Sequence, residues 1–216
     1  GEGVEQDFAE AVKWYRLAAE QGDADAQHAL GYAFSTGEGV EQDFAEAVRL
    51  YRLAAEQGNA RAQFNLGLAY AYGDGVEQDN AEAISWYRLA ADQGNANAQN
   101  KLGDTFYNGI VVEQDYAEAV KWYRLAAEQG DATAQYNLGF AYYNGEGVEQ
   151  DFVEAVKWYR LAAEQGLAWG QYNLGLSYKW GKGVEQDFVE AVKWFRLAAE
   201  QSNADAPVVL GLAYYY

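Results

Sequence analysis

Residues 145–180 read GEGVEQDFVEAVKWYRLAAEQGLAWGQYNLGLSYKW, and this stretch decides the fold because the whole chain repeats it with substitutions. The 216 residues divide into six rows of 36 residues, which begin at Gly1, Gly37, Gly73, Gly109, Gly145 and Gly181. Repeats of roughly this length are typical of helix-hairpin solenoids, in which each unit buries its apolar face by stacking on its neighbours. We number positions within a row, so that position 15 means Tyr15 and its equivalents.

A first helix is predicted in each row between Asp7 and Gly22 and their equivalents. The Asp7 carboxylate is suited to accept backbone N–H bonds at the helix start, and Glu10 completes the pattern of a capping box. Gly22 is typical of a residue that ends a helix in the left-handed conformation. Because the Asp and Glu pair recurs at each helix start without a nucleophile, we interpret these carboxylates as caps and not as acid/base catalysts.

A second helix is predicted over residues 24–36 and their equivalents, after an Asp or Asn cap in most rows. Gly31 is expected to let neighbouring helices approach closely, because a mid-helix glycine otherwise costs about 1 kcal/mol. Three departures carry expectations of their own. Leu167 removes the cap of row five, and Val111 replaces a loop glycine, so this loop must avoid positive φ or carry strain. Pro207 falls in a first helical turn, where a missing N–H is tolerated.

The composition excludes several classes of function. The chain has no Cys, which removes disulfides, thiolate metal sites and cysteine nucleophiles. Its formal charge of −18 repels nucleic acids and anionic lipids. No apolar run approaches the roughly 20 residues that span a bilayer, and no signal peptide is evident. We therefore expect a soluble protein that binds no nucleic acid and inserts into no membrane.

The repeated text resembles the Sel1-like repeat family, which is similar to tetratricopeptide repeats. One full copy of the family pattern consists of Leu138, Gly139, Tyr142, Gly145, Gly147, Val148, Asp151, Ala155, Trp158, Ala162, Ala163 and Gly166. The resemblance covers the chain and implies an all-α fold in a single domain over residues 1–216. The implied architecture is a right-handed α/α superhelical solenoid of stacked antiparallel helix pairs. Departures from the pattern are Leu50, Val111, Gly170 and Pro207.

The same resemblance makes the second helix of each row the inner, groove-lining helix and the first helix the outer one. In this phase the chain begins with an orphan outer helix and ends with an orphan inner helix that exposes Tyr214, Tyr215 and Tyr216. Such ends lack the polar caps of a solenoid, so we expect a fragment of a longer array or end-to-end self-association. Sel1-like proteins are associated with the bacterial cell envelope, and the periplasm, the exterior and the cytoplasm all stay open as compartments.

Positions that differ between rows mark the candidate binding surface. On the inner helix these are Asp25, His28, Ala29, Tyr32, Ser35, Thr36 and their equivalents, which we call the variable face; they lie within about 120° of the helical wheel. The resemblance implies that these positions face the groove. The candidate ligand-binding residues are Arg61, Phe64, Tyr72, Lys101, Tyr107, Tyr136, Asn137, Phe140, Tyr143, Trp169, Tyr172, Asn173, Lys179 and Trp180.

Aromatic side chains are abundant on the variable face. Tyr and Trp give a large contact area at low entropy cost, and Asn amides can clamp an extended backbone. The alternative interpretation is that many of these aromatic side chains pack sideways between adjacent inner helices. Trp169 and Trp180 are the strongest exceptions to that alternative. The position of Trp169 holds Asp, Arg, Asn or Thr in the other rows, and the position of Trp180 holds Thr, Tyr or Asn.

Most basic residues occupy positions 13 and 16 of the outer helix. We interpret them as ion pairs, Lys13 with Glu10 and Arg16 with Glu20, each contributing a few tenths of a kcal/mol on a solvated face. The variable face also carries basic residues, which hint at an acidic or carboxylate-bearing ligand. These are Arg61, Lys101 and Lys179.

The leading hypothesis for function is a scaffold or adaptor that binds a peptide or a protein surface in its concave aromatic groove. Stacked aromatic rings and amides would also suit a glycan, such as peptidoglycan or an exopolysaccharide. A third interpretation is an engineered or recently duplicated array without a ligand of its own. Catalysis is not expected, because His28 is the sole histidine and no nucleophile, phosphate-loop or metal-ligand motif accompanies it. We therefore expect no cofactor and no metal.

Overall fold

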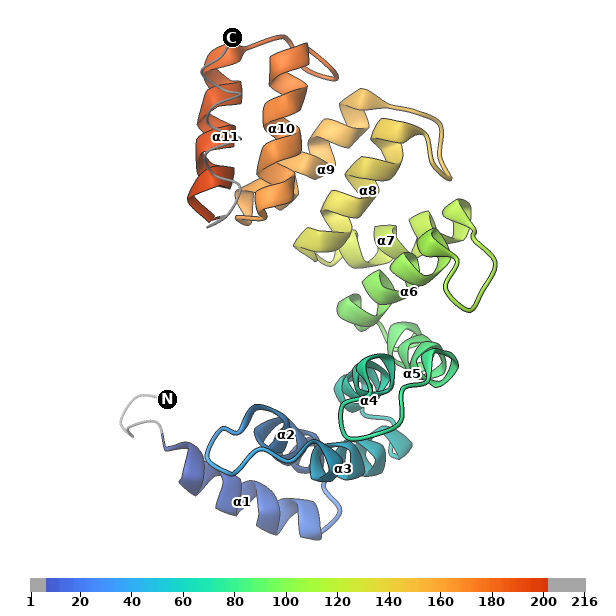
Figure 1. Ribbon diagram of the computed structural model, residues 1–216, viewed down its shortest axis with the longest axis vertical. Coiled ribbons are helices and arrows are strands. Elements are labelled where there is room, and N and C mark those ends of the chain that lie inside the picture. The colour runs from blue at the N-terminus through green and yellow to red at the C-terminus, as the bar shows by residue number, and fades with distance from the viewer. Residues whose placement is uncertain (1–6, 202–216) are drawn as a thin grey trace. The chain divides into compact units, whose positions relative to one another are not determined.

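The computed structural model describes residues 7–201, which form helices and connecting turns (Figure 1). No strand occurs in this part of the chain. The helices are α1 (Phe8–Glu20), α2 (Ala24–Thr36), α3 (Phe44–Glu56), α4 (Ala60–Tyr72), α5 (Asn80–Asp92), α6 (Ala96–Asn108), α7 (Tyr116–Glu128), α8 (Ala132–Asn144), α9 (Phe152–Glu164), α10 (Ala168–Trp180) and α11 (Phe188–Gln201). The predicted all-α fold is therefore confirmed over these residues, as are the predicted helix pairs of rows one to five and the outer helix of row six.

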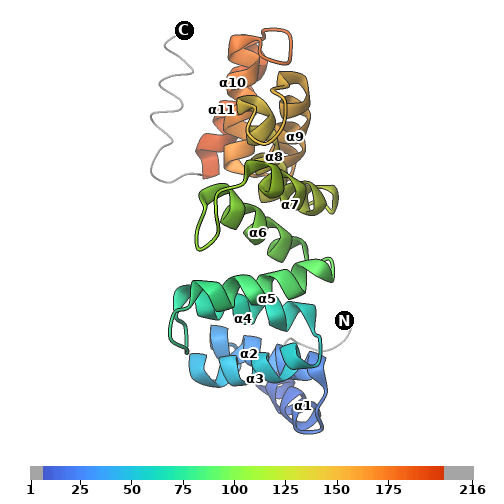
Figure 2. The ribbon, with the colours of Figure 1, turned by 90° about the vertical axis from the view of Figure 1, so that its right-hand side faces the viewer.

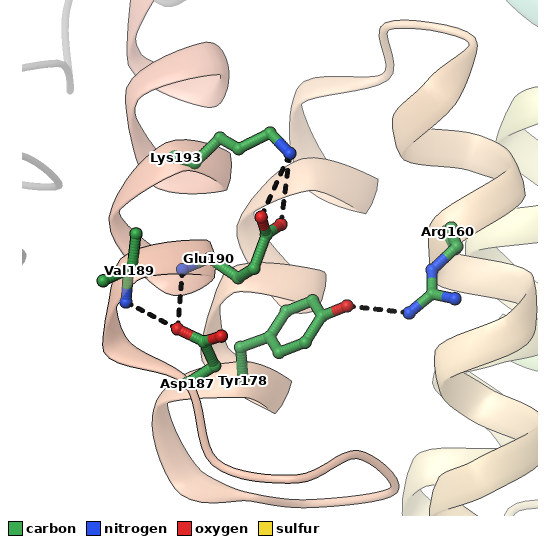
Figure 3. A network of polar contacts seen from close by, with 6 residues as sticks. All are labelled: Arg160, Tyr178, Asp187, Val189, Glu190 and Lys193. Atoms are coloured by element: carbon green, nitrogen blue, oxygen red, sulfur yellow. Dashed lines mark hydrogen bonds and ion pairs between the residues drawn. The ribbon is translucent and has the colours of Figure 1, made fainter.

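The helices start as the sequence predicts, but the capping box is only half formed. Asp187 Oδ1 accepts the backbone N–H groups of Val189 and Glu190 (Figure 3). Each other outer-helix Asp cap likewise accepts the N–H of the Glu three residues later. The Glu190 carboxylate turns instead to Lys193, with Nζ 3.2 Å from either oxygen. The reason is that the Asp187 N–H already donates to the Tyr178 carbonyl of the preceding helix at 3.0 Å.

Arg16 and Arg160, at position 16 of their rows, do not form the predicted pairs with the Glu four residues later. Arg16 lies with its guanidinium carbon 5.8 Å from the centroid of the Phe34 ring, and no ion pair joins it to Glu20. In row five, Arg160 donates to the Tyr178 hydroxyl at 2.9 Å (Figure 3). The prediction of Arg16–Glu20 pairs is therefore wrong, because the inner helix of the same row offers an aromatic partner in place of a solvated carboxylate. The predicted pairs of position 13 with position 10 are confirmed, for example between Lys13 and Glu10 at 2.7 Å.

The inner helices α2, α4, α8 and α10 each pack most extensively on the outer helix that follows. Figures 1 and 2 show α4 beside α5 and α8 beside α9. The predicted close approach at the mid-helix glycine is confirmed. A Cβ on Gly67 would lie 2.6 Å from the Tyr87 ring, and one on Gly139 would lie 2.8 Å from the Tyr159 ring. Only glycine therefore lets the position-15 ring lie flat against the inner helix, and this contact recurs through the core.

The chain divides into two compact units, Gly1–Leu102 and Gly103–Tyr216, with the division inside α6. Unit 1 has a core built from the apolar faces of α1 to α4, with Leu50, Leu66 and Ala54 among its most buried members. Unit 2 has a core in which α9 and α10 bury Tyr159 and Leu174. The interpretation of residues 1–216 as a single domain stays a prediction.

The loops between rows explain both the conserved spacing of the repeat and one exception to it. A Cβ on Gly147, at position 3, would lie 2.2 Å from the Tyr116 carbonyl oxygen of the row before, so the loop closes against the start of that outer helix. Val111 replaces this glycine and has a φ of +66°, the strained alternative of the two that the sequence left open. Leu167 starts α10 without a side-chain cap, as predicted.

Several sequence expectations fall outside the described residues. They concern Pro207, the last inner helix and the exposed Tyr214, Tyr215 and Tyr216.

Candidate functional site

The variable face is best described in each unit by itself, on α2 and α4 in unit 1 and on α8 and α10 in unit 2. Most of its aromatic side chains are half-buried, and their rings pack on the position-15 ring of the following outer helix. In α4, the Phe64 centroid lies 5.9 Å from that of Tyr87. In α10, Tyr172 lies 5.6 Å from Phe195. The remaining pairs of this kind are Tyr107 with Tyr123, Tyr136 with Tyr159 and Tyr143 with Tyr159.

The ring pairs of the described residues differ from the alternative interpretation of the aromatic residues. The sequence suggested sideways packing between adjacent inner helices, whereas these ring pairs join inner to outer helices or lie within one helix, as Tyr136 and Phe140 do at 6.2 Å. The physical reason is the glycine at position 31, which brings the position-15 ring close enough to form a floor beneath the variable face.

Three large aromatic side chains of the predicted site are mostly exposed: Tyr72, Trp169 and Trp180. The exposed fraction is 61% for Trp169 and 58% for Trp180. Both lie on α10, and because they are separated by almost a whole number of turns they share one helix face about 16 Å apart. The Trp169 and Tyr172 rings are packed edge to face, with their centroids 6.3 Å apart. This contact leaves most of the Trp169 indole exposed.

The basic residues predicted for the site differ in their exposure. Arg61 is exposed, Lys101 is half-buried, and Lys179 is buried with Nζ 4.9 Å from the centroid of the Trp180 ring. A further lysine, Lys182, was not among the site residues predicted from the sequence. Lys182 Nζ donates to the Tyr143 hydroxyl at 2.9 Å and lies 5.1 Å from the Phe152 ring centroid. Its signal in the sequence was the replacement of a loop acid by a base at position 2.

The amides of the variable face are already engaged within the protein. Asn65 Nδ2 lies 3.1 Å from His28 Nε2, and Asn173 donates to the Trp169 carbonyl at 2.9 Å. The pKa of His28 is lowered, first by burial and then by the positive charge of Arg61. His28 is thus a packing residue of the variable face, and its neutral form is favoured in the folded protein.

Asp104 anchors a polar cluster in unit 2 that the sequence analysis did not single out. Its Oδ1 accepts from the Tyr123 hydroxyl at 3.0 Å and from Asn137 Nδ2 at 3.3 Å. Burial, followed by the charge of Asp104, raises the pKa of Tyr123 well above its usual range. Beside this cluster, the Tyr107 hydroxyl donates to Glu146 Oε2 at 2.7 Å. One signal for this cluster is visible in the sequence, because position 32 holds a charged residue only in this row.

Cavities open on the variable face at equivalent places in the two units. The Asp104 cavity, of about 310 Å³, is lined by Asp104, Tyr107, Asn108, Tyr123, Tyr136, Asn137 and Phe140. The Tyr32 cavity, of about 320 Å³, is lined by Tyr32, Ser35, Phe44, Ala47, Val48, Tyr51, Asn65, Leu68, Ala69, Tyr72 and Asp74. The two share a position-15 Tyr as a wall but differ at position 32, which is Tyr in unit 1 and Asp in unit 2.

A larger cavity of about 1110 Å³ lies along α1 and α2 in unit 1. Its wall includes Tyr15, which is 41% exposed, whereas the equivalent Tyr51 is 4% exposed beneath Gly31. Phe8 of the same wall is also exposed. The Tyr15 ring of α1 is therefore open, whereas the equivalent Tyr51 ring is covered by the inner helix α2.

The described part of the chain offers no metal centre. Over residues 7–201, no group of three or more His, Cys, Asp or Glu side chains is arranged to hold a metal ion. Among the described helices, none combines the length and the apolar character that a membrane crossing requires.

Antiparallel helix pairs of one repeating text, packed through a glycine and an aromatic ring, define a helical-hairpin solenoid. The chain belongs to the Sel1 repeat family, which it matches at residues 1–23, 24–59, 60–95, 96–131, 132–167 and 170–203. Sel1 repeat proteins generally mediate protein–protein interaction. Among curated proteins, no sequence matches the chain.

Solved structures show the same fold. A Sel1 repeat protein from Oxalobacter formigenes is 36% identical with a TM-score of 0.84, and the match covers 95% of this chain and 87% of that one. The protective antigen c5321 of uropathogenic Escherichia coli is 38% identical with a TM-score of 0.68. That match covers 100% of this chain and 54% of the antigen. The immunity protein PA5088 from Pseudomonas aeruginosa is 25% identical, with a TM-score of 0.57 and coverage of 86% and 67%.

Proposed function

We propose that the protein is an interaction scaffold that binds a peptide or a partner surface through the variable face. The observation that carries this proposal is the exposure of Trp169 and Trp180 on one face of α10. Large aromatic side chains are enriched among the residues that dominate binding energy, and burying two indoles would supply several kcal/mol. The half-buried rings around them form a rigid floor, which lowers the entropy cost of binding.

The test uses a variant in which Trp169 and Trp180 are both changed to Ala. Because both side chains are exposed, we expect the fold to stay intact and partner capture from lysate, quantified by mass spectrometry, to fall at least about tenfold. Trp14→Ala is the matched control, since Trp14 is 64% exposed but lies on the outer helix α1. Equal capture by the double variant and the parent protein would refute the proposal.

The glycan alternative makes a different prediction for the same residues. Soluble peptidoglycan or exopolysaccharide fragments should change the fluorescence of Trp169 and Trp180 if stacked rings hold sugar. No observation on the variable face favours this ligand over a protein, so the protein partner is the function that we put forward.

A further inference from the structure

The Asp104 cavity differs from its counterpart in unit 1 in the way that matters for a ligand, which is charge. Each cavity lies beside a position-15 Tyr and is lined by residues of one unit alone, in unit 1 for the Tyr32 cavity and in unit 2 for the Asp104 cavity. The Tyr32 cavity has a neutral ring at position 32 and one carboxylate, Asp74, at its edge, whereas the Asp104 cavity has a carboxylate at position 32 itself. A repeat that otherwise keeps this position neutral has therefore placed one negative charge among aromatic walls.

The carboxylate of Asp104 is held in a fixed orientation. Tyr123 and Asn137, from α7 and α8, both donate to its Oδ1, and Tyr123 is itself buried. These donors stabilise the ionised form, because hydrogen bonds to a charged carboxylate favour that charge. The raised pKa of Tyr123 agrees with a negative charge beside its hydroxyl. The cavity thus presents a preorganised anion.

The walls of the Asp104 cavity suit a flat cation. Tyr107, Tyr136 and Phe140 contribute aromatic rings, whose faces attract cations. Glu146 adds a second negative charge beside the cavity through its bond to the Tyr107 hydroxyl. A guanidinium is weakly hydrated, stacks on rings and pairs with carboxylates through a planar fork, whereas an ammonium keeps its water more tightly. The formal charge of −18 also attracts basic partners over a longer range.

We propose that the Asp104 cavity binds the guanidinium group of an arginine side chain supplied by the partner. This inference rests on the proposed function, because it names the chemistry by which the variable face recognises a protein. It replaces the acidic ligand suggested by the basic residues in the sequence, because Lys179 is buried against a Trp180 ring and the position-32 acid faces the cavity.

The test is a titration followed by ¹H–¹⁵N NMR, with the peptide Ac-Gly-Gly-Arg-Gly-Gly-amide as the probe. We expect saturable shifts of the Asn137 side-chain amide, with a Kd of about 1–10 mM for so small a ligand. The same peptide with citrulline, the neutral isostere of arginine, should bind at least about tenfold more weakly. Asp104→Asn keeps the acceptor for Tyr123 but removes the charge, and it should weaken arginine binding by a similar factor.

Asp74→Asn is the matched control, because it makes the same change of net charge at the Tyr32 cavity. It should leave the arginine titration unchanged. The inference is overturned if citrulline binds as well as arginine, if Asp104→Asn binds as well as the parent, if a lysine peptide binds more tightly, or if no shift reaches Asn137. Partner capture by the Trp169 and Trp180 double variant is read separately, so arginine binding without any partner capture would refute the proposed scaffold alone.

Discussion

Tyr159→Phe and Tyr123→Phe remove the same hydroxyl from the same repeat position, yet we expect them to change stability in opposite directions. Tyr159 is 1% exposed, and its hydroxyl has no hydrogen-bond partner within the described residues. Tyr123 donates its hydroxyl to the Asp104 carboxylate at 3.0 Å. Phe195 occupies this position in row six and is equally buried, so the surrounding packing accepts a ring without a hydroxyl.

The size of each change in the free energy of unfolding depends on whether the removed hydroxyl was hydrogen-bonded. A buried hydroxyl without a partner costs about 1–3 kcal/mol, so removing it from Tyr159 should raise the free energy of unfolding by about 1 kcal/mol. A hydrogen bond to a charged group contributes about 1.5–3 kcal/mol, so Tyr123→Phe should lower that free energy by about 2 kcal/mol. Tyr51→Phe, which loses a bond of 3.1 Å to Ser35, should fall between them.

Urea unfolding followed by circular dichroism and by intrinsic fluorescence measures all three variants against the parent protein. Repeat proteins do not always unfold in one step, and two-state unfolding is therefore checked directly. The two probes should give coincident transitions, and the slope of the unfolding free energy against urea concentration should be the same in all variants. The reasoning is refuted if Tyr159→Phe destabilises the protein as much as Tyr123→Phe does. That result would mean that the Tyr159 hydroxyl has a partner in solution.

Three further predictions concern backbone, packing and pH. Val111→Gly should raise the free energy of unfolding by about 1 kcal/mol in urea titrations, because Val111 has a φ of +66°; lower stability would show that the loop is unstrained. Gly139→Ala should cost about 1–3 kcal/mol in the same assay, since its Cβ would meet the Tyr159 ring at 2.8 Å, and a neutral result would show that this ring can shift. The pKa of His28 is lower in the folded protein than in the unfolded chain, where it is about 6.5, so folding favours the neutral imidazole. The contribution of His28 to the free energy of unfolding is therefore fully present above the unfolded pKa and is lost as the pH falls through that value toward the folded pKa. The parent should therefore lose more stability than His28→Gln between pH 7 and pH 5, and identical pH profiles would contradict this.

The sequence predicts the helices well because their ends depend on local residues. Asp43 accepts the N–H of Glu46 three residues later, and Gly58 has the left-handed φ expected of a helix end. The glycine contact at Gly67 is also foreseeable, because a helical glycine without a packing role would be costly. These features need only the spacing within one row.

The candidate site is harder to predict because its contacts join residues far apart along the chain. Arg124 reaches the Tyr142 hydroxyl 18 residues away, in place of the carboxylate four residues away that local spacing suggests. Asn137 meets Asp104 across 33 residues, and Tyr107 meets Glu146 across 39 residues. The sequence marks Asp104 only as a variable position, and its role as an anchor follows from the helices that surround it.

The position-3 glycine also constrains how a gene for such a protein changes in length. At Gly147 the loop packs closely against the Tyr116 carbonyl, so inserting only part of a row would displace the next helix pair from its packing on the row before. An exchange between misaligned copies of the repeat instead adds or deletes 36 codons and recreates every junction. Recombination can therefore lengthen or shorten the array in whole rows, while point substitutions on the variable face let the rows differ in side-chain chemistry without disturbing these junctions.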